Sequence, residues 1–339
     1  MGDGMNGVQI LAYTPEWWPA YQTLARHAFR PPVYQDRPAL LRWLYEENPY
    51  APNGPTDLTL AVTDTGQVAG CIHKLWIPWQ LGGTYHTVPA LGNLVVLPAQ
   101  RRQGIGRALL AHHFQREPYV LLPNAAPGTD QVYLDFNCQR LAASRERRLL
   151  TPLRAGWRWL SRRIGRASNA IYLPAQPGQQ SWEGYQLTAQ PEATLLGDLA
   201  AQLNGRPGWA RPHWDGAGLA WRFFHPLGPR YWLLYRPVPA GLAFAVLSLG
   251  PRRGYNIARL VAWETAGAEA ILAAANRLAR RLGAHFMLSY AVAERFPATA
   301  PTLPQTFFYA QDGQRLPGYS LQGDAADVGF EAYPPETSA

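Results

Sequence analysis

The sequence predicts an α/β protein made of two tandem mixed-sheet domains with flanking helices. Three observations support this fold class. The length of 339 residues suits two domains, hydrophobic residues make up 47% of the chain, and one strand–helix–strand pattern occurs twice. We therefore expect two cores of ordinary size, one for each copy of the pattern.

Each copy of the pattern begins with a short strand that ends in Pro-Glu and leads into a helix. The first copy reads GVQILAYTPE from residue 7, and the second reads GYQLTAQPE from residue 184. A tryptophan follows 36 positions after Gly7 in LLRWLYEENP, and another follows 37 positions after Gly184 in GLAWRFFHP. This agreement in order and spacing indicates two copies of one α/β unit.

The later elements of each copy also correspond. In the first copy, LTLAVTD, VAGCIHKLWIPW and ALGNLVVL predict strands, a helix is expected from Gly104, and YVLLP predicts a further strand. The second copy offers YWLLYRP, LAFAVLSL, YNIARLVAW, a helix from Gly267, and HFMLSYAV. We expect a first domain over residues 1–150, a basic connector over 151–183, and a second domain over 184–339.

The basic charge of the chain is concentrated near this connector. Between residues 140 and 166 stand nine arginines and one acidic residue, and this excess equals the net charge of +8 for the whole chain. A solvated basic connector is the simplest interpretation, and contact with an acidic partner stays open. A single basic segment argues against nucleic acid as a partner.

Composition also bears on the compartment and on metals. Two cysteines, Cys71 and Cys138, exclude a disulfide scaffold and favour a reducing cytoplasm. The N-terminus lacks the pattern of a signal peptide, and the longest apolar run is about half of a membrane span, so no membrane partner is expected. The adjacent His112 and His113 point to different faces of a helix, and no metal site is predicted.

The segment VLPAQRRQGIGRALL, residues 96–110, has the properties of an anion site. Pro98 ends an apolar central strand, and Gly104 and Gly106 let the backbone approach a ligand closely. Unpaired amides at the start of the next helix, together with the helix dipole, attract negative charge. The positive side chains are those of Arg101, Arg102 and Arg107. The segment is neither a Walker loop, because no Gly-Lys-Ser/Thr follows, nor a dinucleotide fingerprint, because Leu109 stands where the third glycine belongs.

In Arg101, Gly104 and Gly106 this segment resembles the R/Q-x-x-G-x-G/A signature of the GNAT N-acetyltransferase superfamily. The resemblance implies GNAT-like mixed-sheet domains and acetyl-coenzyme A as the co-substrate, without a metal. It further implies that the backbone from Arg102 to Arg107, which includes Gln103 and Ile105, holds the pyrophosphate. The strand edge near Leu94 and Val96 would pair with the pantetheine arm.

A second part of the resemblance lies in DQVYLDFNC, residues 130–138, where the family has an aromatic pair followed by Gly-Phe. Asn137 replaces the glycine, which a left-handed helix end tolerates, and Cys138 replaces the phenylalanine, which is a real departure. The resemblance implies that Tyr133 gives a proton to the departing thiolate; the alternative is a packed aromatic at a helix end. Asn124 corresponds to a turn residue that touches the cofactor.

The expected activity is acyl-coenzyme A-dependent N-acyl transfer, with acetyl-coenzyme A as donor and an amine of a small molecule or peptide as acceptor. The alternative is a non-catalytic coenzyme A-binding or regulatory protein on a decayed acetyltransferase fold. The central strand offers no carboxylate, only Asn93, so Glu46, Glu47, His86 and water all stay open as the base. The sequence does not indicate an oligomeric state.

The second copy is expected to have lost the cofactor. No arginine precedes Gly267, and Glu264 and Glu269 flank the helix start, where they would repel a pyrophosphate. We therefore expect a degenerate second domain that serves as a packing partner.

Overall fold

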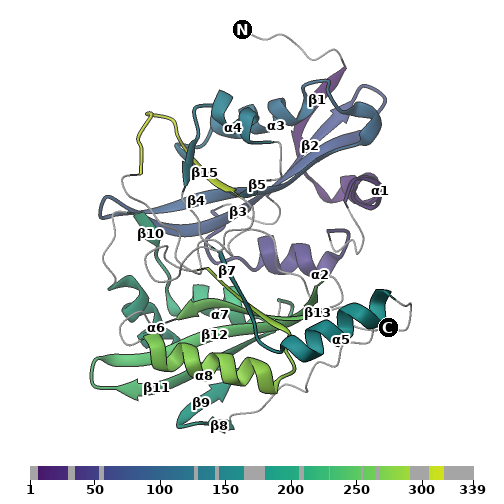
Figure 1. Cartoon of the computed structure of the whole chain (residues 1–339). Helices are drawn as coiled ribbons and strands as arrows, with labels where there is room; N and C mark the ends of the chain where they lie inside the picture. Colours follow the sequence, from purple (N-terminus) through teal and green to yellow (C-terminus); the bar gives the residue numbers. More distant parts are fainter. Residues whose placement is uncertain are drawn as a thin grey trace.

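The computed structural model describes most of the chain as two β-sheets with helices on their faces. The described residues are 7–29, 35–52, 57–125, 129–141, 145–163, 180–205, 210–228, 230–252, 255–263, 268–290 and 305–316. Two mixed sheets with flanking helices confirm the α/β fold class (Figure 1).

The first sheet has the order β1-β2-β3-β4-β5-β15-β6, and β10 pairs with β3. Its strands are β1 (Val8–Ala12), β2 (Leu58–Thr63), β3 (Val68–Leu81), β4 (Thr84–Val96), β5 (Tyr119–Ala125), β15 (Gln305–Ala310), β6 (Gln139–Leu141) and β10 (Ala210–Pro212). Helices α3 (Ile105–Phe114) and α4 (Asp130–Asp135) belong to one face; η1 (Pro15–Trp17), α1 (Trp18–Ala28), α2 (Pro38–Leu41) and the π-helical turn η2 (Arg42–Glu46) belong to the other.

The second sheet has the order β7-β14-β13-β12-β11-β9-β8. Its strands are β7 (Arg145–Leu149), β14 (Phe286–Tyr290), β13 (Tyr255–Trp263), β12 (Gly241–Arg252), β11 (Tyr231–Val238), β9 (Tyr185–Thr188) and β8 (Gln180–Trp182). Helices α6 (Ala193–Asn204) and α7 (Gly216–Phe224) belong to one face, α8 (Ala268–Arg281) belongs to the other, and α5 (Pro152–Arg163) follows β7. The strand and helix positions predicted for both copies from β2 and β11 onward are confirmed.

Strands cross between the two units: β10 and β15 of the second copy join the first sheet, and β7 joins the second sheet. β15, from the end of the described chain, lies between β5 and β6 of the first sheet, with Phe308 opposite Leu121. In return β7, which follows the first copy, pairs with β14 of the second sheet, with Leu149 opposite Phe286. The strand pairing therefore crosses the domain limits at residues 150 and 184 expected from the sequence. Period-2 patterning identifies a strand but not the distant strand with which it pairs.

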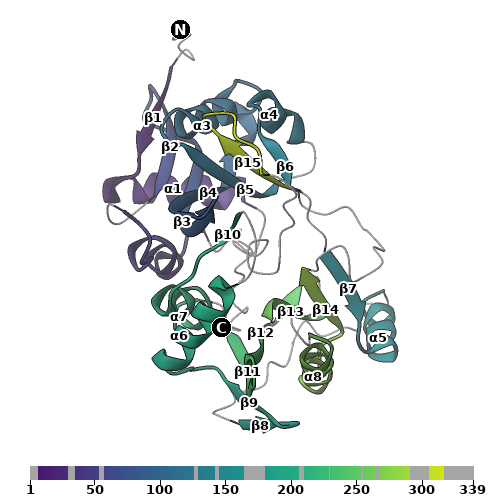
Figure 2. The ribbon, with the colours of Figure 1, turned by 90° about the vertical axis from the view of Figure 1, so that its left-hand side faces the viewer.

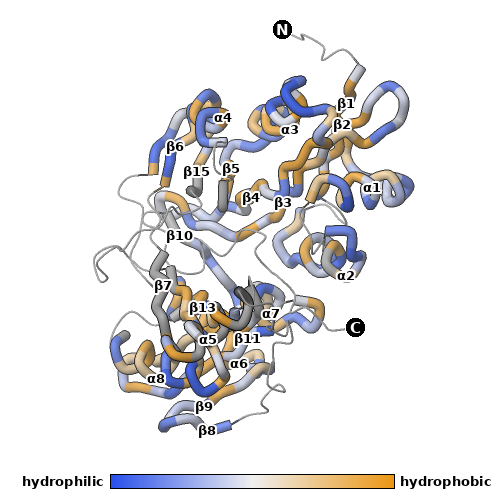
Figure 3. Tube along the Cα trace, turned by 45° about the vertical axis from the view of Figure 1, so that its right-hand side comes forward, coloured by the Kyte–Doolittle hydropathy of each residue, from blue (hydrophilic) through white to orange (hydrophobic). Residues whose placement is uncertain are grey.

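The molecule is layered, and its central layer belongs to both units. Figure 1 shows α3 and α4 outside the first sheet, α2, α6 and α7 between the sheets, and α8 outside the second sheet. Figure 2 shows α6 and α7 on one side of β11, β12 and β13, and α8 on the other side. One hydrophobic cluster joins the inner faces, from Leu75 and Trp79 of β3 to Leu233 of β11 and Phe244 of β12. In Figure 3 the hydrophobic colour follows β2 and β3, whose residues line this cluster and the outer one.

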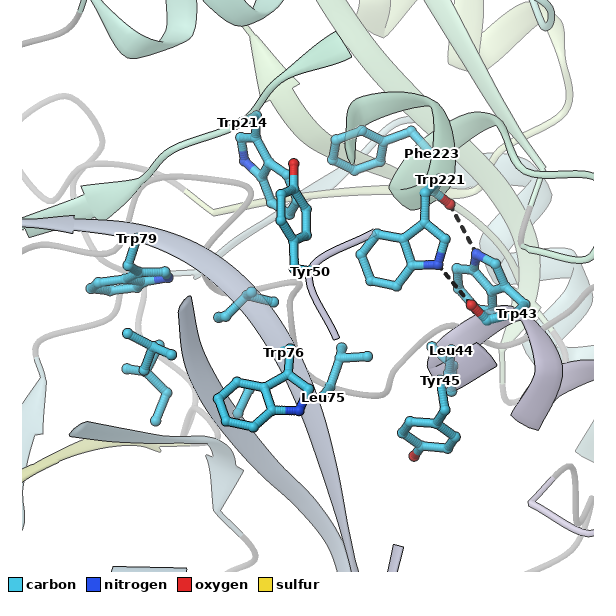
Figure 4. Packing of buried hydrophobic residues seen from close by; sticks show 14 of the residues in the cluster. Trp43, Leu44, Tyr45, Tyr50, Leu75, Trp76, Trp79, Trp214, Trp221 and Phe223 are labelled. Carbon is cyan, nitrogen blue, oxygen red and sulfur yellow. Dashed lines mark hydrogen bonds between the residues drawn. The ribbon is translucent and has the colours of Figure 1, made fainter. Parts of the chain in front are cut away.

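Two tryptophans at matching positions of the repeat meet between the sheets. Trp43 Nε1 donates to the backbone oxygen of Trp221 (2.9 Å), and Trp221 Nε1 donates to the backbone oxygen of Trp43 (2.7 Å) (Figure 4). A reciprocal pair of this kind is what two equivalent residues make across a two-fold axis. Together with the exchanged strands, the pair indicates that the two units are related by an approximate two-fold axis.

Candidate functional site

The site is built around a bulge near the end of the central strand β4. Cys71 of β3 lies opposite Val95, whereas His73 lies opposite Gly92, so β4 carries one extra residue between these pairs. Asn93 has φ 50°, in the left-handed region, where asparagine is one of the tolerated residues. β4 pairs with β5 at Ala90 opposite Leu121, and beyond it the described residues of the two strands form no further ladder. The edge of β4 is therefore open beside the bulge.

The loop after β4 presents backbone amides at the same end of the sheet. Arg102 (φ 65°) and Gly104 (φ 82°) both turn through the left-handed region before α3 begins at Ile105. The first helical bond runs from the amide of Ala108 to the oxygen of Gly104 (3.0 Å). The amides of Ile105, Gly106 and Arg107 consequently have no carbonyl partner within the helix, and no acidic residue stands in its first turn.

Gly106 keeps the surface between α3 and β4 free of a side chain. A Cβ built on Gly106 would lie 3.9 Å from methyl groups of Leu94 and Val96, at ordinary contact distance. The space that this Cβ would fill is therefore part of the surface between the edge of β4 and the start of α3. An extended arm with a pyrophosphate end fits this surface, because open backbone lies at one end and open amides lie at the other.

The three arginines of the loop are not equivalent. Arg101 Nε donates to the oxygen of Val96 (3.1 Å), which braces the end of β4. Arg107 Nη1 pairs with Asp135 Oδ2 (3.0 Å) of α4, and its guanidinium lies over the ring of Phe136. Two of the cations predicted for the anion therefore have protein partners, and Arg102 is exposed beside the amides. The backbone amide of Arg107 remains open at the start of α3.

Tyr133 lies on α4 in the hydrophobic cluster that also contains Ile105 and is lined by Leu94 and Val96. Its side chain is 8% exposed, and its ring lies 5.1 Å from that of Phe307 in the exchanged strand β15. Burial raises the pKa of Tyr133, although a hydrogen bond with the side chain of Thr129 opposes the shift. The phenol is therefore protonated at neutral pH and has a proton to donate.

The residues left open as a base are not gathered at the bulge. Glu47 pairs with Arg42 and with His225 of the second unit, and Glu46 is exposed. His86 packs against Tyr119 near the start of β4, seven residues and so roughly 23 Å along the strand from Asn93. Asn124 was expected in the turn after the strand, but it lies within β5, and its side chain is outside the described residues.

Sequence reasoning missed four polar residues that approach the bulge from the other face of the sheet. They are Tyr21, Gln35, Tyr45 and His73, all nearly or fully buried. The available signal was His73, an imidazole next to Lys74 in the otherwise apolar strand VAGCIHKLWIPW. Its partners come from distant segments, and no local pattern connects them.

The second unit keeps the bulge but differs at each functional position. Val246 pairs with Ala262 and Leu247 pairs with Leu260, so Val261 is the extra residue, and it is fully buried. Eight residues separate β4 from α3, whereas four separate β13 from α8. Glu269 stands in the first turn of α8. Glu264 and Gly267 lie outside the described residues.

The geometry is that of a coenzyme A-type acyltransferase fold, and a comparison with family models agrees. Residues 17–116 match the acetyltransferase (GNAT) family, so the first unit contains a GNAT domain. This match confirms the resemblance seen in the glycine-rich segment. A comparison with curated proteins found no significant match.

Solved structures share the arrangement of both units. A GCN5-related N-acetyltransferase from Anabaena variabilis superposes with a TM-score of 0.57 at 11% identity, over 90% of this chain and 73% of its own. A probable N-acyltransferase from Enterococcus faecalis gives 0.58 at 13%, over 91% and 73%. The N-myristoyltransferase of Saccharomyces cerevisiae, solved with myristoyl-coenzyme A, gives 0.54 at 10%, over 89% and 82%. At these identities the likeness is one of fold.

Among the described residues, no helix has the length and hydropathy required to cross a membrane. No group of three or more histidine, cysteine or acidic side chains in the described ranges is arranged to hold a metal ion.

Proposed function

We propose that the protein is an N-acyltransferase that moves an acyl group, by preference acetyl, from coenzyme A to an amine. The observation that carries the proposal is the R-x-x-G-x-G loop, whose open amides at the start of α3 stand beside the open edge of β4. The GNAT match over residues 17–116 supports the same donor. The acceptor is an amine of a small molecule or peptide, and the proposed compartment is the cytoplasm, to which two unpaired, buried cysteines are suited.

The amides from Ile105 to Arg107 would hold the pyrophosphate, and the β4 edge near Leu94 and Val96 would align the pantetheine arm. The amine nitrogen then attacks the thioester carbon, so a C–N bond forms as the C–S bond breaks. A backbone amide near Val96 is placed to stabilise the charge on the carbonyl oxygen. The thiolate leaves with the electron pair and takes the proton of Tyr133, which solvent replaces, while the amine loses its own proton to water.

Direct transfer is favoured over an acyl-cysteine route. Burial raises the pKa of Cys138 to about 12 and that of Cys71 still further, so both side chains are thiols at neutral pH. A thiol is a poor nucleophile compared with a thiolate. Single displacement of coenzyme A by the amine requires neither cysteine.

The proposal is tested by release of free thiol from acetyl-coenzyme A in the presence of a panel of amines. The panel covers amino sugars, polyamines, aminoglycosides and peptides with free N-termini. Thiol release that depends on one class of amine supports the proposal. If coenzyme A binds and no amine is acylated, the chain is a coenzyme A-binding protein on a decayed transferase fold.

A further inference from the structure

A chain of hydrogen bonds crosses the inner face of the first sheet, opposite the face that carries α3 and α4. Tyr21 of α1 and Tyr45 of η2 contact opposite nitrogens of His73, at 3.1 Å from Nε2 and 2.5 Å from Nδ1 respectively. All three side chains are at most 1% exposed. A buried imidazole placed between two phenols is a costly arrangement, because each polar group must keep its partner.

The directions of these bonds can be deduced. The hydroxyl of Tyr21 donates to the backbone oxygen of Gln35 (2.9 Å), so toward His73 its oxygen can only accept. His73 therefore carries its proton on Nε2, and Nδ1 accepts from the hydroxyl of Tyr45. Burial lowers the pKa of His73 to about 3, which keeps the ring neutral and this tautomer in place at working pH. The imidazole is thus a fixed connector and does not serve as a base.

The chain leads to the bulge of β4. The side chain of Gln35, itself 4% exposed, donates from Nε2 to Oδ1 of Asn93 (3.3 Å). Asn93 is half-buried, and its backbone oxygen lies 3.9 Å from the sulfur of Cys71. Of the five residues in this hydrogen-bonded chain, Asn93 alone is more than 4% exposed. It lies beyond the last residue pair of the β4–β5 ladder.

We propose that Asn93 contacts the acceptor amine, and that Gln35 and the Tyr21–His73–Tyr45 chain are positioning residues that fix its carboxamide. This inference rests on the proposed transferase function. A carboxamide oxygen has two lone pairs, and Gln35 occupies one of them. The second accepts an N–H of the incoming amine and turns the nitrogen lone pair toward the thioester carbon. An amide does not take up a proton at neutral pH, so Asn93 orients the amine and does not act as its base.

The contact can be measured without turnover. The probe is coenzyme A whose sulfur carries a CH₂–CO–NH–propyl group, which places an N–H beyond the position of the acyl carbon. Calorimetry compares this probe with free coenzyme A on wild type and on Asn93→Ala. We expect Asn93→Ala to lose about five- to tenfold in affinity for the probe, as for one hydrogen bond, and to keep its affinity for coenzyme A.

The matched control is Asn256→Ala, which removes a buried amide from β13, a strand of the second sheet. It should bind both ligands as wild type does. Equal affinity of Asn93→Ala and wild type for the probe would overturn the inference, and so would an equal loss for probe and coenzyme A. Failure of wild type to bind coenzyme A at all would instead remove the proposed function.

The positioning role has its own readout. Tyr21→Phe deletes the hydroxyl between His73 and Gln35. We expect this variant to lose two- to fivefold in affinity for the probe and to keep its affinity for coenzyme A. Nitrogen-15 spectra of the wild type should show His73 protonated on Nε2 alone, with no titration between pH 5 and 8. A Tyr21→Phe protein that binds the probe like wild type, or a His73 protonated on Nδ1, would contradict the positioning role.

Discussion

At the scale of single residues, Gly106 offers the cleanest test of cofactor binding. Gly104 has a positive φ, so any side chain there strains the backbone, whereas a Cβ on Gly106 meets only ordinary contacts at 3.9 Å. We expect Gly106→Val to weaken coenzyme A binding by about tenfold or more, because its side chain is larger than the alanine that the R/Q-x-x-G-x-G/A signature accepts here and enters the space between α3 and β4. Calorimetry measures the affinity, and thermal unfolding of the same sample verifies that the variant is folded.

Gly197→Val in α6 is the matched control, because a Cβ at Gly197 meets nothing within 4 Å. It should bind coenzyme A as tightly as wild type. If a folded Gly106→Val protein binds coenzyme A as tightly as wild type, the cofactor does not lie between α3 and β4.

For Tyr133, a packing role of the ring must be distinguished from a chemical role of the hydroxyl as proton donor to the thiolate. Tyr133→Phe keeps the ring contact with Phe307 and removes only the hydroxyl, so cofactor binding should persist while turnover falls by roughly 10²-fold. Single-turnover thiol release measures the chemical step. Wild-type turnover at every pH would leave Tyr133 with a packing role alone.

Two buried histidines make the fold sensitive to acid. Burial lowers the pKa of His73 and His113 to about 3, while in the unfolded chain both titrate near 6.5. Below pH 6.5 the unfolded state therefore binds more protons than the folded state. The free energy of unfolding that these residues contribute above pH 6.5 is lost as the pH falls toward 3. By pH 5 the two residues together should cost roughly 4 kcal/mol.

Urea midpoints between pH 7 and 5 measure this loss. His27→Asn, which changes an exposed histidine on α1, is the control for the loss of a histidine side chain as such. A stability that is constant from pH 6.5 to 5 would show that one or both imidazoles accept a proton in the folded state.

At the scale of elements, the exchanged strand β15 completes the first sheet although it follows the second copy in the chain. Its two phenylalanines are both buried: Phe307 faces the α3–α4 layer and Phe308 faces the central layer. We expect Phe307→Ala to cost about 3–5 kcal/mol and to remove hydrogen-exchange protection from β5 and β6 in particular. Met287→Ala in β14 should instead affect the second sheet. Loss of protection confined to the second sheet in Phe307→Ala would contradict the strand order.

The same elements show what sequence reasoning can reach. Period-2 patterns and the glycine-rich loop predicted β2 to β5, α3 and the anion site, because these depend on neighbouring residues. The partners of β7 and β15 were not predictable, since pairing over more than a hundred residues leaves no local trace. For the same reason, Arg107 reads as a phosphate ligand in the sequence, while its partner Asp135 lies 28 positions away.

At the scale of the whole molecule, the two units share a core but differ in their sites. The second unit has Val261 at its bulge, a shorter connection to α8 and Glu269 in the first helical turn. We therefore expect one molecule of acetyl-coenzyme A to bind per chain in calorimetry, and Gly106→Val to weaken that single binding event. A stoichiometry of two would mean that the second unit retains a cofactor site.

The strand exchange also bears on how the chain is made. During synthesis the first unit emerges from the ribosome before β15 has been made. At typical rates of elongation, roughly 10–30 s pass between completion of the first unit and addition of residue 310. During that interval the outer edge of β5 is bare, and β7 waits for a partner that has not yet been made. Nascent chains stalled before residue 305 should therefore be aggregation-prone, and both halves should reach their native form together, as the last strand arrives.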